Sequence, residues 1–112
     1  MSRAGIPRLN PVFTVALQIV EKAFGNEDPK VAIALNNLAF LYDAQGRYAE
    51  AEPMFKRAQT IVETVLGPGH PSLATSLENF TALMRKTGRK AEAIEMEARA
   101  RAIRAKHAIP NL

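Results

Sequence analysis

The feature that most constrains the fold of this chain is an internal repeat with a period of 42 residues. Aligning the sequence with itself at this offset pairs residues 11–61 with residues 53–103, and 21 of these 51 pairs are identical. Turn-forming residues recur as well, because Gly25 and Pro29 fall on Gly67 and Pro71. The fold must therefore stack copies of one structural unit.

Each unit is predicted to be a pair of helices. Asp28 can cap a helix whose first residue is Pro29, and Gly46 can end it in a left-handed conformation. The following helix is expected from about residue 48 to residue 66, and the second unit from residues 71–87 and 90–107. No segment alternates as a strand would, so the fold class is all-α. Between residues 29 and 45, apolar side chains follow one helical face: Val31, Leu35, Leu38, Leu41 and Tyr42.

The chain is predicted to hold two and a half repeats, which makes five helices. Residues 11–24 align with the second helix of a unit and form the half repeat. The whole repeats are residues 29–66 and 71–107, residues 1–10 are expected to be irregular, and residues 108–112 form a tail. His70 precedes Pro71 as Asp28 precedes Pro29, so we place it in the turn that starts a helix.

The composition excludes several classes of protein. There is no cysteine, and two histidines 37 positions apart are too few for a metal site, so neither disulfides nor cofactors are expected. No phosphate-binding loop or hydrolase motif is present, which indicates a protein that is not an enzyme. The longest apolar run, residues 31–42, is shorter than the ~20 residues of a membrane-spanning helix. Without a signal-peptide pattern, a cytoplasmic location is expected.

The net charge of +4 belongs to the last segment alone. Residues 1–80 carry 7 basic and 8 acidic side chains, whereas residues 81–112 carry 8 basic and 3 acidic ones. Glu92, Glu95 and Glu97 interrupt this basic segment, and no aromatic residues are interleaved with it. Nucleic acid is therefore not an expected partner.

Small and large residues alternate at fixed places of both helices. In the first unit these are Leu35, Leu38, Ala39, Tyr42, Ala51, Phe55 and Ala58, and in the second Leu77, Phe80, Ala93 and Ala100. Together with the runs LNNLAFLY and QGRYAEAEPMFKRA, the pattern over residues 11–107 resembles tetratricopeptide repeats, in particular the 42-residue repeats of kinesin light chains. The resemblance implies a right-handed α-solenoid whose first helices line a concave peptide-binding face. Alanine suits places where helices approach to roughly 8–10 Å.

Asparagines stand at equivalent places of the two first helices, Asn37 and Asn79, and Asn36 precedes one of them. A side-chain amide both donates and accepts, so such a row can bind the backbone of a peptide without reading its sequence. The resemblance implies the same, because an asparagine at this place is a frequent ligand contact in the family. The alternative is that these amides bond neighbouring backbone groups and only hold the repeats in register.

Further groove residues follow from the same alignment. Phe40 lies off the inward-facing stripe and is the predicted apolar anchor. Arg85 and Lys86 could select an acidic peptide, although charges at a helix end are more often solvated. The predicted groove comprises Asn36, Asn37, Phe40, Asp43, Glu78, Asn79, Arg85 and Lys86.

The two ends of the array differ in sequence. Glu97 stands where the first repeat has Phe55, so residues 90–107 are expected to form a C-terminal cap, with Leu112 near the natural end. Val15 and Ile19 are apolar on a helix without a first-helix partner, which indicates either a longer array or a homo-oligomer.

The predicted function is that of a non-catalytic interaction module that binds a peptide segment of a partner protein. The alternative is a structural, self-assembling segment of a larger scaffold.

Overall fold

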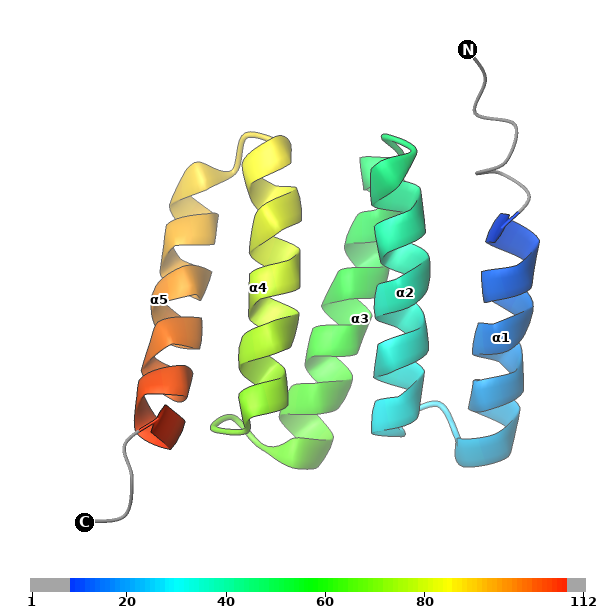
Figure 1. The fold of residues 1–112 in the computed structure, drawn as a ribbon, viewed down its shortest axis with the longest axis horizontal. Coiled ribbons are helices and arrows are strands. Elements are labelled where there is room, and N and C mark those ends of the chain that lie inside the picture. Colours follow the sequence, from blue (N-terminus) through cyan, green and yellow to red (C-terminus); the bar gives the residue numbers. More distant parts are fainter. Residues whose placement is uncertain (1–8, 109–112) are drawn as a thin grey trace.

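The computed structural model describes residues 9–108, and within that range the regular structure consists of five helices. They are α1 (Leu9–Phe24), α2 (Pro29–Ala44), α3 (Tyr48–Leu66), α4 (Pro71–Lys86) and α5 (Lys90–Ala108). The helices stand side by side in a row, with α1 at one end and α5 at the other (Figure 1). The expectation of an all-α repeat fold is therefore confirmed.

Helix α1 begins earlier than expected, because Leu9 and Asn10 are already helical. Pro11 does not prevent this, since a residue in the first turn has no helical acceptor for its N–H. The Asn10 side chain is held by Gln45, whose Nε2 donates to Asn10 Oδ1 at 2.8 Å. The rest of the expected irregular segment, residues 1–8, and residues 109–112 of the tail lie outside the described residues.

Both first helices start at a capped proline. Asp28 Oδ1 accepts a hydrogen bond from the backbone N–H of Lys30 at 2.8 Å, directly before α2. His70 does the same for α4, because its Nδ1 accepts from the N–H of Ser72 at 3.0 Å. A histidine thus replaces a carboxylate as the cap of the second repeat.

The core lies between neighbouring helices of the row. Helix α2 packs between α1 and α3, and α4 packs between α3 and α5. The small residues let helices approach closely, and the large ones fill the spaces between them. Tyr42 is half-buried, and the other residues of the alternating pattern are buried: Leu35, Leu38, Ala39, Ala51, Phe55, Ala58, Leu77, Phe80, Ala93 and Ala100.

Replacing Ala51 by leucine tests this packing. Ala51 is 0% exposed, so Ala51→Leu should overpack the α2–α3 contact and lower the free energy of unfolding by about 1–3 kcal/mol. Urea denaturation monitored by circular dichroism measures the change. Ala49→Leu, at an exposed place of the same helix, is the matched control and should be close to neutral. Equal losses in the two variants would contradict the packing.

The cap of α4 gives a second prediction. His70→Ala removes the acceptor for the Ser72 N–H and should cost about 1 kcal/mol of stability. His70→Asp restores the residue type that caps α2 and should keep or increase the stability. Thermal unfolding of the three proteins at neutral pH compares them. A His70→Asp variant as unstable as His70→Ala would show that the side chain does not act as a cap.

Candidate functional site

A hollow of about 180 Å³ lies between α2 and α4, the first helices of the two repeats, and residues of α3 also line it. One of its walls carries a polar group that lacks a partner: Asn36 Oδ1 is buried and accepts no hydrogen bond. The lining residues come from α2 (Pro29, Ala32, Ile33, Asn36), α3 (Val62, Leu66) and α4 (Ser72, Thr75, Ser76).

Neither of the two equivalent asparagines lines this hollow, although each follows a lining residue by one helical turn. Asn37 lies one turn after Ile33 and is exposed, while Asn79 lies one turn after Thr75 and is half-buried. Among residues 9–108, the structure records no hydrogen bond from either side chain. The alternative role, in which these amides bond nearby backbone groups, therefore finds no such bond in the described structure.

Phe40 continues the same face of α2. Its ring meets the buried ring of Phe55 edge-on, with 5.3 Å between centroids and an angle of 77° between the planes. The side chain is nevertheless 45% exposed. One part of the ring is thus fixed by the core while the other faces solvent.

The charged residues of the predicted groove all take part in ion pairs. Lys86 Nζ lies 3.0 Å from Asp43 Oδ1, which joins α4 to α2 across the groove. Arg85 holds Glu97 of α5 through two hydrogen bonds of 2.8 and 2.5 Å.

Glu78 is engaged in the same way, because Arg104 of α5 donates to its two carboxylate oxygens at 2.7 and 2.8 Å. The structure therefore divides the predicted set. Asn36, Asn37, Phe40 and Asn79 keep polar or apolar groups available, whereas Asp43, Glu78, Arg85 and Lys86 neutralise charges within the chain.

Two glutamates of the α4–α5 pairs have lowered pKa values. Hydrogen bonds from Arg104 lower the pKa of Glu78, and hydrogen bonds from Arg85 lower that of Glu97, both from an ordinary value of 4.5. A carboxyl group with a lowered pKa stabilises the folded chain above its unfolded pKa. That contribution is lost as the pH falls through the folded value.

Acid titration tests these pairs. As the pH falls from about 5 to about 3, the stability of the chain should decrease, and it should decrease less in the double variant Glu78→Gln/Glu97→Gln. Urea midpoints at several pH values give the slope. Glu95→Gln, at an exposed glutamate of α5 that forms no ion pair among the described residues, is the matched control. A double variant with the wild-type slope would contradict the assignment.

Sequence reasoning missed a second class of ion pair, which joins successive second helices. Arg57 of α3 lies 2.8 Å from Glu21 of α1, and Arg99 of α5 lies 2.6 Å from Glu63 of α3. Both partners recur at the 42-residue offset. That double recurrence is a signal that could have identified the pairs.

Other kinds of site find little support in the described part of the chain. Residues 9–108 contain no cluster of three side chains able to hold a metal ion. None of the described helices combines the length and apolar character needed to cross a membrane.

The family model for the tetratricopeptide repeat matches residues 13–64 and 31–106. Among solved structures, BtubC (BKLC) from P. vanneervenii is similar at a TM-score of 0.83 and 26% identity, covering 96% of this chain and 44% of that one. A kinesin light chain candidate of Podosopora anserina with nearly identical TPR-like repeats gives 0.80 and 25%, covering 93% and 49%. This chain thus spans less than half the length of either neighbour. No curated protein matches it in sequence.

The family match extends over well more than half of the residues, and both neighbours share the kinesin light chain-like repeat architecture. The expected resemblance is confirmed. The chain belongs to the tetratricopeptide repeat family, whose repeats generally mediate protein–protein interactions.

Proposed function

We propose that the face formed by α2 and α4 binds an extended peptide segment of a partner protein, without catalysis. The observation that carries this proposal is the pair of asparagines, Asn37 and Asn79, which stand one repeat apart with no hydrogen bond from either side chain among the described residues. Interaction modules of this family are typically non-catalytic.

The spacing of the repeats suits an extended chain. Packed helices lie roughly 10 Å apart, and three residues of extended peptide at ~3.3 Å each span the same distance. One amide per repeat can therefore meet the backbone of such a peptide at regular intervals. Each hydrogen bond contributes about 0.5–1.5 kcal/mol, and none of them depends on the side chains of the peptide.

Two other groups on this face add to the case. Asn36 lines the hollow, and its Oδ1 accepts no hydrogen bond from the protein, so it is an acceptor for a ligand N–H. The exposed part of Phe40 offers an apolar surface to a ligand side chain. Amides and one aromatic ring thus supply both backbone contacts and an anchor.

Arg85 and Lys86 contribute little to peptide selection in this proposal. An incoming carboxylate would have to compete with Glu97 for Arg85 and with Asp43 for Lys86. We therefore assign recognition mainly to the amides and Phe40, and expect little preference for acidic sequences.

A structural role is the second candidate, and a different observation favours it. Val12 and Ile19 of α1 are each 61% exposed, on a helix that contributes no residue to the hollow between α2 and α4. Such apolar residues indicate assembly with another helix.

Selection from a random peptide library displayed on phage tests groove binding. The strongest selected peptide is labelled with fluorescein, and its affinity is measured by anisotropy. The variant Asn37→Ala/Asn79→Ala should weaken binding roughly 5- to 150-fold, because two hydrogen bonds of about 0.5–1.5 kcal/mol are lost. Its helicity should be unchanged, since both side chains lie outside the core.

The matched control is Asn26→Ala, at an exposed asparagine in the turn after α1. It should bind the peptide as the wild type does. Failure to select any peptide, or equal affinity in the double variant and the wild type, would rule out the asparagine row as the binding site and leave the structural role.

A further inference from the structure

Second helices carry a stripe that packs against the first helix of their own repeat. The stripe residues recur at the 42-residue offset, which identifies their counterparts on α1. In α3 they are Met54, Ala58 and Ile61, in α5 Met96, Ala100 and Ile103, and on α1 Val12, Ala16 and Ile19, which we call the α1 stripe.

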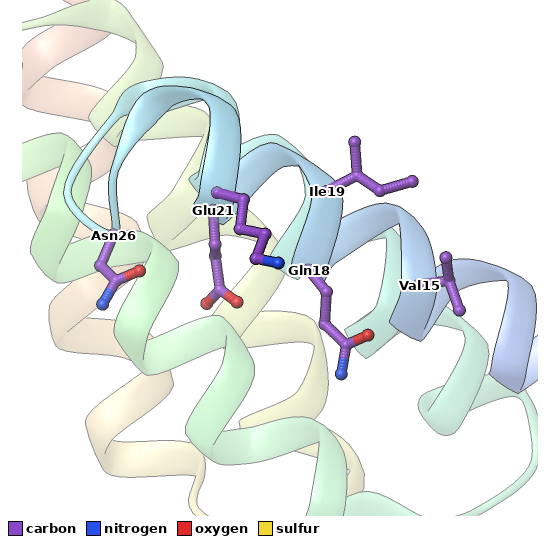
Figure 2. A pocket seen from close by; sticks show the side chains of 6 residues that line it. Val15, Gln18, Ile19, Glu21 and Asn26 are labelled. Atoms are coloured by element: carbon purple, nitrogen blue, oxygen red, sulfur yellow. The ribbon is translucent and has the colours of Figure 1, made fainter.

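The stripe is covered on α3 and α5 but open on α1. Ala58 and Ile61 are 0% and 2% exposed, whereas the α1 counterpart of Ile61, Ile19, is 61% exposed. The reason is that α1 packs against α2 alone among the described helices, while α3 has α2 on one side and α4 on the other. Figure 2 shows Ile19 and Val15 projecting from α1 into open space.

We propose that the α1 stripe is a docking site for the first helix of another repeat. The partner is identified by what covers the same residues elsewhere in the chain: α2 covers the stripe of α3, and α4 covers that of α5. It is therefore an amphipathic helix with the apolar spacing of Leu35, Leu38 and Ala39. Such a helix would continue an interface that the chain already forms twice.

The first helices of a second copy do not supply this partner. In every copy, α2 and α4 are each held between two second helices, so the core-facing apolar stripe of neither helix is free. The opposite edge of the row is also unsuitable, because Glu97 and Arg104 of α5 stand where α3 has Phe55 and Val62. Their charges are paired with Arg85 and Glu78 of α4.

A graft supplies such a helix within one chain. A copy of residues 27–47 replaces residues 1–5, so that the added helix precedes α2 by 42 residues and keeps the register of the repeat. The added helix should cover the α1 stripe and raise the midpoint of thermal unfolding by roughly 5 °C or more. Circular dichroism at 222 nm measures the midpoint with and without the graft.

Two substitutions at isoleucines of similar exposure distinguish docking on the α1 stripe from a non-specific effect of adding a charge. In the grafted chain, Ile19→Glu should abolish most of the increase. Ile33→Glu in the original α2, at a side chain that is 63% exposed, should leave the increase intact. Without the graft, both substitutions should change the midpoint little, because both side chains already face solvent.

Two results would overturn the proposal. One is a grafted chain whose midpoint does not rise, or rises equally with Ile19→Glu. The other concerns the ungrafted chain in sedimentation velocity: a dimer that disappears with Ile19→Glu would make a second copy the occupant of the stripe. Neither result bears on peptide binding by Asn37 and Asn79, which lie on other helices.

Discussion

The structure depends on one constraint, which is that no second helix can bury its apolar stripe without a first helix beside it. Helices α2 and α4 meet this need because each packs between two second helices. Neighbouring helices approach each other closely because alanine occupies positions in their contacts. Ala39, Ala51 and Ala58 are all 0% exposed. Larger side chains such as Phe55 fill the remaining space, as the dense packing of protein interiors requires. The order of the helices in the row, and which of their faces remain exposed to solvent, follow from this packing.

The repeated pair of helices gives rise to three faces that differ in chemistry. Between α2 and α4, the amides and Phe40 form the proposed peptide-binding face. At α5, Glu97 and Arg104 replace apolar residues of α3 and are paired with α4, so that edge carries compensated charge. At α1, apolar residues remain exposed because α1 packs against α2 alone among the described helices. The repeat thus fixes where each side chain lies, and the residue type at that position decides what the surface can bind.

Sequence reasoning succeeds where the signals are local. The 42-residue period, the Asp28-Pro29 start and the glycine at the end of α2, which has a φ of 76°, predict helix number and boundaries because each acts within a few residues. It fails where a contact joins distant segments. The early start of α1 includes an amide pair 35 residues apart, and the partner of Arg85 lies on the next helix. The positive charge of Arg85 alone predicts that it pairs with an anion. Only the packing of α4 on α5 identifies that anion as Glu97.

Amide hydrogen exchange followed by NMR tests the central claim most directly. Helices held between two neighbours open only when the row separates, whereas α1 can detach from a single partner. We expect the core amides of α2, α3 and α4 to exchange slowest and at similar rates, and those of α1 and α5 to exchange faster, because each of these two helices packs against a single described helix. Protection of α1 equal to that of α2 and α4 would contradict the account, because it would mean that the exposed stripe of α1 is covered in solution or that helix stability does not come from neighbour packing.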